Sequence, residues 1–389
     1  MRLYQKIIVG VLAVISLIVA AATVYGMQAI DDANSMMNNI SKTLNRKSSK
    51  REQAASIENR DPFSILLLGV DTGALGRTEK GRSDSMMVVT VNPQKEETTI
   101  VSLDRDIMAD MLDDGQTFDK MNHAYAYGGE ELAMDAAEKL LDIPIDHFVT
   151  INMQGLRDLI DAVGGITVNN KIAFTLEGVR VPKGKVKLNG KTGLAYARMR
   201  KQDPDGDIGR QKRQREVLTK IVEKVISMDS VTNYKKILKA VEKNSQTDLT
   251  WDDLLDIASN YYPAFEKVNQ EQLQGQSQLI NGIYYQILGE NELLTVQNKL
   301  KKQLNLPTSD TLKIDPQNEY SQNGLIANQF YDDSEGGEGL TGDTSTSASE
   351  GTVTTETEDQ SQYQYQEQQP EQPAVESQTP TDGVENYGY

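Results

Sequence analysis

Charged residues stand at the ends of three short apolar runs in the first third of the sequence. Asp71 follows FSILLLGV, Arg82 and Asp84 stand just before SMMVVTVN, and Arg105 and Asp106 come after TTIVSL. Because the connections between these runs are too short for a helical crossover, the runs are predicted to pair as antiparallel strands. The five charged side chains would then lie on one edge of a sheet.

Carboxylates and guanidiniums gathered at such an edge indicate binding of a cation and of phosphate. Carboxylate oxygens suit a hard cation such as Mg²⁺, and arginines beside them can hold phosphate oxygens through paired hydrogen bonds. A solvated loop with incidental charge would explain any one of these residues. It explains their clustering much less well, so the pattern favours a magnesium and phosphate site.

A second group of charges lies in the stretch YARMRKQDPDGDIGRQKRQREVL, which contains seven Lys and Arg residues. Its apolar spacing predicts a helix over 209–226, and the apolar stripe, followed back in steps of four, reaches Gln214 and Arg210. We expect these two side chains to carry function. Three other basic residues lie off the stripe and are predicted to form a solvated face: Lys212, Arg215 and Lys220.

Upstream of that helix, Arg198 and Arg200 are separated by one residue. They point to the same side if the segment is extended and diverge if it is helical. Arginines directed into one cleft beside a helix N-terminus suit two linked phosphates, as in a pyrophosphate. Nucleic acid is a poor alternative, because the chain outside its tail is nearly neutral and few aromatic residues lie near the cluster.

The elements that position these residues alternate between strands and helices, which predicts an α/β core. Helical patterns cover 130–141 and 153–163, and a strand pattern covers 147–151. The apolar faces of the two helices could line a groove for a long lipid chain or simply form the core. The two histidines, His123 and His147, are predicted to be structural, which makes histidine acid–base catalysis a weak hypothesis.

Composition divides the chain into parts. The net charge is −17, but residues 321–389 hold fourteen Asp and Glu and no Lys or Arg. This segment has few aliphatic residues, so a disordered acidic tail is predicted over 311–389. The chain contains no cysteine, which excludes disulfides, thiolate metal sites and a cysteine nucleophile.

The N-terminus carries an uncharged apolar run, residues 7–27, which is long enough to span a bilayer. Basic residues before the run favour a cytoplasmic N-terminus over 1–6. A cleaved signal peptide is the alternative, although the run is longer than is usual for one. Residues 28–60 have apolar spacing typical of a helical stalk with possible self-association, and 61–310 would form an extracellular domain.

The chain resembles the LytR-CpsA-Psr proteins of Gram-positive cell envelopes. The resemblance extends from about Phe63 to Val217 and rests on several motifs in a fixed order. These are LLLGVD, GRSDSMMVVTVN, VSLDRD, KMNHAYAYGG, IDHFVTINMQGLRDLIDAVGGITV, LNGKTGLAYARMR and GDIGRQKRQREVL.

The resemblance implies an α-β-α sandwich with a mixed central sheet and a membrane-anchored phosphotransferase. Such enzymes move wall teichoic acid, capsular polysaccharide or related glycopolymers from undecaprenyl pyrophosphate to peptidoglycan, with Mg²⁺ as cofactor. By motif, it assigns metal binding to Asp71 and Asp84, catalysis to Arg82, Arg105, Arg198, Arg200, Arg210 and Gln214, and a weaker substrate-binding role to Lys120. Asp106, from the sheet edge, is a further weak candidate.

One position departs from the family pattern, because Asp104 stands where a proline usually precedes the arginine of VSLDRD. An added carboxylate there could alter metal affinity or the pose of Arg105. Three other functions remain open. They are a polyprenyl-pyrophosphate hydrolase, a non-catalytic scaffold that binds lipid-linked precursors, and, most weakly, a transcriptional regulator.

Overall fold

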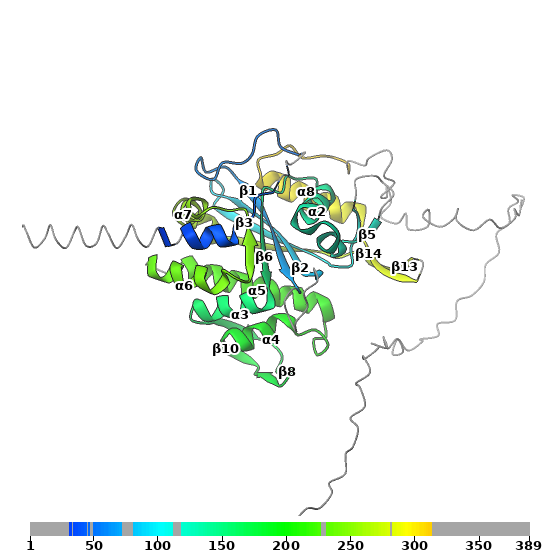
Figure 1. Cartoon of the computed structure of the whole chain (residues 1–389). Coiled ribbons are helices and arrows are strands. Elements are labelled where there is room, and N and C mark those ends of the chain that lie inside the picture. Colours follow the sequence, from blue (N-terminus) through cyan, green and yellow to red (C-terminus); the bar gives the residue numbers. More distant parts are fainter. Residues whose placement is uncertain are drawn as a thin grey trace, which may run out of the picture. The chain divides into compact units, whose positions relative to one another are not determined.

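The computed structural model describes residues 31–32, 34–44, 46, 50–71, 81–111, 118–226, 231–280 and 282–312 (Figure 1). The predicted anchor at 7–27 and nearly all of the predicted acidic tail lie outside these ranges. Among the helices that the structure describes, none is long and apolar enough to cross a bilayer. The anchor therefore stays a prediction.

A mixed sheet of six strands forms the centre of the described fold. Its order is β11 (Ser245–Thr247), β6 (His147–Asn152), β1 (Phe63–Val70), β2 (Ser83–Asn92), β3 (Glu97–Leu103) and β12 (Val268–Leu273). The first three strands along the chain are antiparallel neighbours, as the short connections predicted. The pairs β1–β6 and β3–β12 are parallel, which makes the sheet mixed.

Helices cover both faces of this sheet, because successive side chains of each strand point to opposite sides. Leu66 and Leu68 of β1 pack on one side with α2 (His123–Leu141) and α8 (Glu290–Gln303), which lie next to each other in Figure 1. Ile65 and Leu67 face the other side, where α7 (Trp251–Asn260) and the 3₁₀ helix η2 (Tyr262–Phe265) pack. The sequence prediction of an α/β fold with a mixed central sheet is confirmed.

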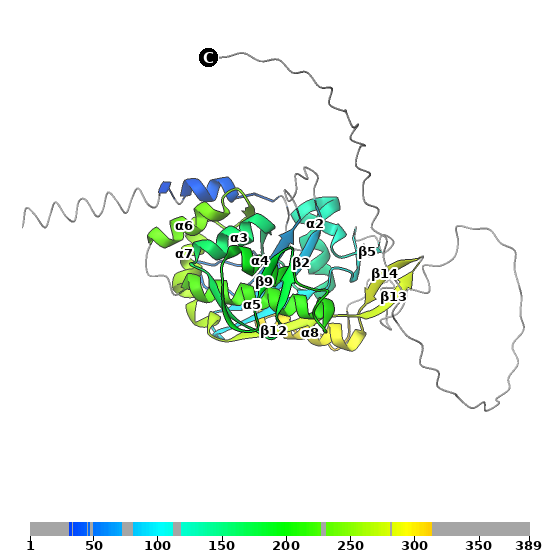
Figure 2. The ribbon, with the colours of Figure 1, turned by 90° about the horizontal axis from the view of Figure 1, so that it is seen from below.

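A second core lies beside the sheet and is built by α3 (Met153–Ala162), α4 (Gly190–Arg198) and α5 (Gly206–Ile226). These helices lie close together in Figures 1 and 2. Two small sheets close this core, β7 (Ile166–Asn170) with β10 (Gly184–Leu188), and β8 (Phe174–Leu176) with β9 (Val179–Val181). The remaining described elements are α6 (Val231–Val241), β4 (Met108–Asp110), β5 (Phe118–Lys120), β13 (Gln276–Ile280) and β14 (Ile283–Ile287).

Two predicted helix starts were too late. The helix predicted at 130 begins at His123, because a kink at Gly129 (φ 67°, ψ −146°) joins two helical pieces that sequence periodicity cannot connect. The helix predicted at 209 begins at Gly206. The apolar faces of α2 and α3 pack into two different cores.

The segment predicted as a helical stalk packs against the domain over its described part. Its helix ends at Ile40, and Met37 and Ile40 are buried, at 3% exposure each, against Leu238 and Trp251. Ser41 forms a β-bridge with Thr247. From Ser41 to Arg60, the described residues of this segment are not helical. Apolar spacing gave the helix but could not show that its buried side faces this domain.

Ion pairs hold the following part of the segment in place. The Arg46 guanidinium lies 2.6 Å from Glu138 and also pairs with Asp135, both on α2. It donates a further hydrogen bond to the carbonyl of Ile145 (2.9 Å). Arg46 and Glu138 are almost fully buried. Removing one partner would leave a buried charge, so the contact fixes the path of the segment over α2.

Truncation of Ile40 tests this docking. In a fragment of residues 31–312, Ile40→Ala is expected to lower the free energy of unfolding by about 2–5 kcal/mol, because it empties a buried site. Urea unfolding followed by circular dichroism measures the change. The exposed neighbour Asn38, changed to Ala, is the control, and equal stability of the Ile40 variant and the parent would contradict docking.

Candidate functional site

Sheet register brings the predicted residues to one edge. Val70 pairs with Ser83, and Met86 pairs with Leu103, so the end of β1, the start of β2 and the end of β3 coincide. The backbone N–H of Asp71 donates to the carbonyl of Arg82 at 3.2 Å. The antiparallel order thus places Asp71, Arg82, Asp84, Arg105 and Asp106 together, as the sequence predicted.

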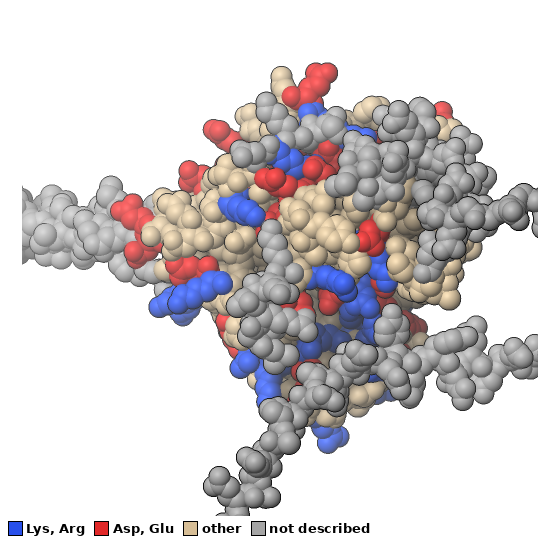
Figure 3. Space-filling model, turned by 45° about the vertical axis from the view of Figure 1, so that its right-hand side comes forward, with Lys and Arg blue, Asp and Glu red and all other residues tan. Residues whose placement is uncertain are grey.

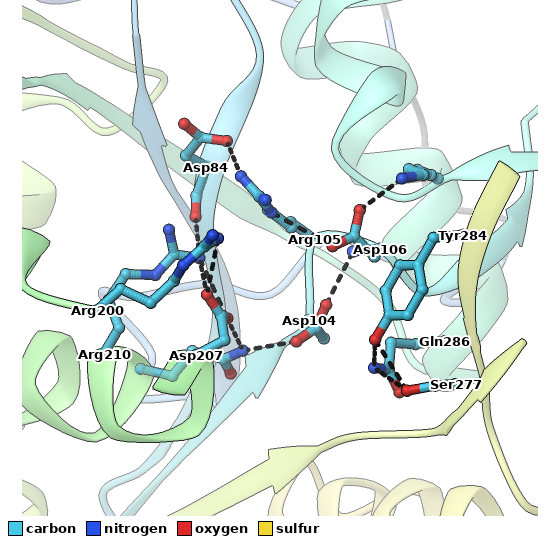
Figure 4. A network of polar contacts seen from close by, with 12 residues as sticks. Asp84, Asp104, Arg105, Asp106, Arg200, Asp207, Arg210, Ser277, Tyr284 and Gln286 are labelled. Atoms are coloured by element: carbon cyan, nitrogen blue, oxygen red, sulfur yellow. Dashed lines mark hydrogen bonds and ion pairs between the residues drawn. The ribbon is translucent and has the colours of Figure 1, made fainter. Parts of the chain in front are cut away.

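Arg105 lies at the centre of this edge (Figure 4). Its Nη1 is 3.3 Å from Oδ1 of Asp84, and its Nε is 3.4 Å from Oδ2 of Asp106. Lys120, at the end of β5, contacts the other oxygen of Asp106 at 2.9 Å. Both arginine contacts are long, and the Arg105 side chain is 30% exposed. An incoming anion can therefore compete for this guanidinium.

Helix α5 contributes Arg210 and Gln214, the two residues that extended its apolar stripe. Arg210 Nη2 lies 2.9 Å from Asp207 and donates to the backbone carbonyl of Asp84 at 3.4 Å. One turn later, the side-chain oxygen of Gln214 accepts a hydrogen bond from Ser85 (3.0 Å). Both side chains face β2, which fixes α5 against the strand that carries Asp84.

The loop DPDGD neutralises much of the nearby basic cluster. Asp203 pairs with Arg213, Asp205 with Lys212 (2.9 Å), and Asp207 with Arg210. Gly209 allows the loop to approach, because a Cβ there would lie about 2.0 Å from the Asp203 carboxylate. The acidic loop and the basic helix therefore form one unit.

The two arginines upstream of the loop diverge. Helix α4 ends at Arg198, whose guanidinium makes two 2.9 Å hydrogen bonds to Glu177 in the β8–β9 turn. Arg200 lies instead on the side of the site, with Nη1 3.9 Å from Asp207 (Figure 4). Of the two geometries that the sequence left open, the structure has the divergent one.

Arg215 corrects a prediction, because it is buried at 4% exposure and does not lie on a solvated face. Its guanidinium donates to Ser102 Oγ (2.5 Å) and contacts Gln270 and Gln272 on β12. Burial lowers its pKa. Lys212 is exposed, as predicted. The error arose because helix periodicity shows which residues are off the main stripe but not that a second element covers them.

Sequence reasoning missed a polar bridge between the two halves of the site. The side-chain NH₂ of Gln211 donates to Asp104 and to Asp207, both at 3.0 Å. The other oxygen of Asp104 accepts from the backbone N–H of Asp106 (2.9 Å). Gln211 thereby links the loop that carries Arg105 to the start of α5. The spacing of Gln211 beside Arg210 gave no signal of this role.

Asp104 is a buried carboxyl, at 5% exposure. Burial raises its pKa, and the negative charge of Asp207 acts in the same direction. The family resemblance predicts a proline at this position. The side chain here is an added acceptor that fixes Gln211 and the backbone at Asp106.

Hairpin β13–β14 also reaches the site, which the sequence did not predict. The backbone N–H of Gln286 donates to the carbonyl of Asp106 at 2.8 Å. Lys120 Nζ lies 5.7 Å from the ring centre of Tyr284, within range of a cation–π contact. No local pattern signals a contact between segments so far apart in sequence.

The residues at this edge fit part of a Mg²⁺ ligand set. Asp84 is 41% exposed, and the backbone of Asp71 is hydrogen-bonded to that of Arg82, two residues before Asp84. Among the described residues, no cluster of three or more metal-binding side chains is found. Mg²⁺ commonly uses one or two carboxylates and completes its shell with water and phosphate oxygens. Two aspartates therefore suffice.

Both histidines contact carboxylates. His147 Nδ1 lies 3.1 Å from Asp248, and His123 Nδ1 lies 2.7 Å from Asp119. Burial acts to lower the pKa of His147, but the nearby carboxylates of Asp248, Asp146 and Asp253 together outweigh it, and the net shift is upward. His147 on β6 is thus tied to Asp248, which follows β11, and this contact suits a structural histidine.

Comparison with known proteins gives consistent similarities. A profile of the LytR_cpsA_psr family matches residues 24–302. A relative from Enterococcus faecalis, named polyisoprenyl-teichoic acid–peptidoglycan teichoic acid transferase TagU, is 48% identical over 301 residues, covering 77% of this chain and 98% of that protein.

Solved structures are similar as well. One from Enterococcus faecalis, described as a transcriptional regulator, shares 55% identity with a TM-score of 0.60, covering 66% of this chain and 92% of that chain. Another, described as TagT bound to LIIa-WTA, shares 30% identity with a TM-score of 0.57, covering 67% and 98% respectively.

Replacement of Gln211 by Leu tests the polar bridge. The variant leaves the buried Asp104 carboxylate with fewer donors and is expected to lose about 1–3 kcal/mol of unfolding free energy at pH 7. Because burial already raises the pKa of Asp104, this carboxyl takes up a proton as the pH falls, and the penalty for its charge disappears.

The difference in unfolding free energy between parent and variant should therefore be largest near neutral pH and smaller in acid. Urea titrations at several pH values measure it. Lys212→Leu, at the exposed neighbouring position, is the control. If the loss of unfolding free energy in Gln211→Leu does not change with pH, Asp104 is not its cause.

Proposed function

Since the chain belongs to the LytR-CpsA-Psr family, we propose that it transfers an anionic glycopolymer from a polyisoprenyl pyrophosphate carrier to peptidoglycan. The relative from Enterococcus faecalis carries a name that states this activity for teichoic acid. The observation in this chain that supports it best is the group of Arg105, Arg200 and Arg210 around Asp84 and Asp207. Three guanidiniums at one strand edge suit the charge of a pyrophosphate.

The two reacting phosphates would replace the present carboxylate partners of these arginines. Among the described residues, the Arg105 guanidinium contacts carboxylates at 3.3 and 3.4 Å, and that of Arg200 contacts one at 3.9 Å, so little is lost when they turn to a phosphate. Arg210 is more firmly held by Asp207, at 2.9 Å. It would therefore be a fixed donor, while the other two adjust.

The reaction is a displacement at phosphorus. A peptidoglycan hydroxyl oxygen forms a bond to the phosphorus nearer the sugar, and the bond from that phosphorus to the bridging oxygen breaks. Polyisoprenyl phosphate leaves with the bonding electrons, and Arg105, Arg200 and Arg210 stabilise its charge. The hydroxyl proton passes to a carboxylate at this edge, for which Asp71, Asp84 and, less favourably, Asp106 are the candidates.

Asp71 and Asp84 would hold Mg²⁺, with water and phosphate oxygens as the other ligands. The cation, when bound, would neutralise charge on the phosphates. Arg82, which is exposed beside Asp71, and Lys120, which pairs with Asp106, are further contacts for the substrate. Arg198 pairs with Glu177 away from Asp207, so a direct role for it would require that pair to open.

We place the protein at the cell membrane, with an anchor at 7–27, a cytoplasmic N-terminus and the domain outside. The uncharged run at 7–27 and a substrate carried on a lipid support this placement. In the described part of 28–60, Met37 and Ile40 pack within the chain.

Transfer measured with purified components tests the proposed function. Full-length protein in detergent receives Mg²⁺, a synthetic polyprenyl-pyrophosphate oligosaccharide and peptidoglycan fragments. Arg210→Ala and Asp84→Ala are each expected to lower kcat/KM by about 100-fold or more, since each removes a charge that acts on the transition state.

Lys212→Ala is the matched control, because Lys212 lies on the same helix but points to solvent, and it should keep parental activity. Oligosaccharide phosphate released into water would favour a hydrolase. Tight binding of the donor without any turnover would favour a scaffold.

Removal of divalent cations tests the metal proposal. Excess EDTA should abolish transfer and added Mg²⁺ should restore it. Asp71→Asn should raise the Mg²⁺ concentration needed for half-maximal activity, because a neutral amide binds the cation more weakly than a carboxylate. Full activity in EDTA would rule out a required metal.

A further inference from the structure

A concentrated basic surface lies outside the strand edge, on the layer that carries α4. Residues 166–201 contain nine Lys and Arg but only one acidic residue, Glu177, in a chain whose net charge is −17. Figure 3 shows Lys and Arg side chains gathered in the lower half of one face of the molecule. We define the basic surface by six of its exposed members: Lys171, Arg180, Lys183, Lys185, Lys187 and Lys201.

These charges are not balanced locally. Glu177 is already bound by Arg198 through two hydrogen bonds. Within the part of the chain that the structure describes, no carboxylate forms an ion pair with a member of the basic surface, in contrast to Lys212 and Arg213 next to it. Repulsion among these cations destabilises the fold slightly, so a partner of opposite charge would be favoured.

The fold does not need these side chains for packing. Along β10, Val186 and Leu188 turn to the second core, while Lys185 and Lys187 alternate with them and point to solvent. Strand geometry places the two lysines on one side, about 7 Å apart. Their positive charges form a row along the outer face of the β7–β10 sheet.

The basic surface continues into the site. Arg180 pairs across β8–β9 with Thr175, and the carbonyl of Thr175 accepts a hydrogen bond from Gln202 (2.9 Å). Gln202 follows Arg200 and Lys201 in the sequence, and Arg200 reaches Asp207. A chain of contacts thus joins Arg180 to the arginines of the site.

The side chains of the basic surface indicate a partner that binds through its negative charge alone. The large apolar side chains that the described residues expose lie elsewhere, at Tyr127, Leu255, Tyr262, Leu279, Ile283 and Tyr284. Without exposed aromatic or aliphatic anchors, the surface lacks what a stable protein interface or stacked nucleotide bases require. A flexible chain of phosphates requires only positive charge.

We propose that the basic surface binds the anionic repeat units of the glycopolymer donor, beyond the pyrophosphate that the strand edge holds. This proposal rests on the proposed function for the identity of the polymer. In it, residues outside the reacting site select donors by their length and charge. Longer anionic donors then bind more tightly than short ones, because each further phosphate meets another cation.

A binding experiment tests the surface without any transfer. The probe is a labelled poly(glycerol phosphate) oligomer without lipid carrier, titrated with full-length protein in detergent and followed by fluorescence anisotropy at several NaCl concentrations. The test variant is Arg180→Gln/Lys185→Gln/Lys187→Gln. The control Lys236→Gln/Lys239→Gln/Lys302→Gln removes the same charge from exposed positions on α6 and α8.

The test variant should bind at least about tenfold more weakly than the parent, and the slope of log affinity against log salt should fall by about 2 to 3, since three phosphate contacts are lost. The control should bind like the parent, and an uncharged oligosaccharide should not bind. Parental affinity in the test variant would overturn the proposal, as would equal loss in the control.

Transfer assays separate this proposal from the proposed function. With a donor that carries a single neutral sugar, the test variant should keep the parental kcat and KM, whereas KM should rise only for donors with several anionic repeats. If the protein transfers no glycopolymer but binds the oligomer through these residues, the proposed function is wrong and the proposal for the basic surface stands. Binding to anionic phospholipid vesicles but not to the oligomer would mean that the surface contacts the membrane instead.

Discussion

The repulsion between guanidinium groups at one sheet edge is the constraint around which the site is arranged. Arg105, Arg200 and Arg210 are balanced by carboxylates that come from three separate segments, among them Asp84 on β2 and Asp207 on α5 (Figure 4). Each arginine needs a nearby negative charge in the free protein, and a pyrophosphate can take over that role. The carboxylates therefore keep the site assembled until substrate arrives.

The ion pair of Arg105 and Asp84 at the site is longer and more exposed than the ion pairs that hold the scaffold. Lys301 and Asp142 are both almost fully buried in their ion pair, and so are Arg46 and Glu138. Arg105 and Asp84 are partly exposed and 3.3 Å apart. Buried pairs are costly to separate, whereas exposed long ones contribute little. Rigid pairs thus hold the scaffold, and weak pairs lie at the proposed substrate site.

Helix α5 divides its basic residues between these two purposes. Arg213 donates to the backbone of Tyr196 and Met199, so it fastens the end of α4 to α5. This contact keeps Arg200 next to Arg210. Arg215 is buried against β3 and β12, and Arg210 faces the site. The positive charge that is concentrated in this stretch therefore stabilises the fold as much as it serves the reaction.

The sequence by itself determined the strands at the site and the residues at their ends. Apolar runs with short connections require antiparallel neighbours, so Asp71, Asp84 and Arg105 had to meet. The stripe of α5 likewise predicted that Arg210 and Gln214 continue its apolar side, because residues four apart share a helix face. Both inferences depend only on local periodicity and chain connectivity.

Only the tertiary structure decided the contacts between distant segments. The burial of Arg215 against Gln270, the bridge from Gln211 to Asp104, and the docking of Ile40 on Trp251 join residues that no local pattern relates. The pairing of Arg198 with Glu177 likewise depends on where the β8–β9 turn lies. Such contacts are set by the packing of whole elements, and a side chain that is off one apolar stripe can still be covered by another element.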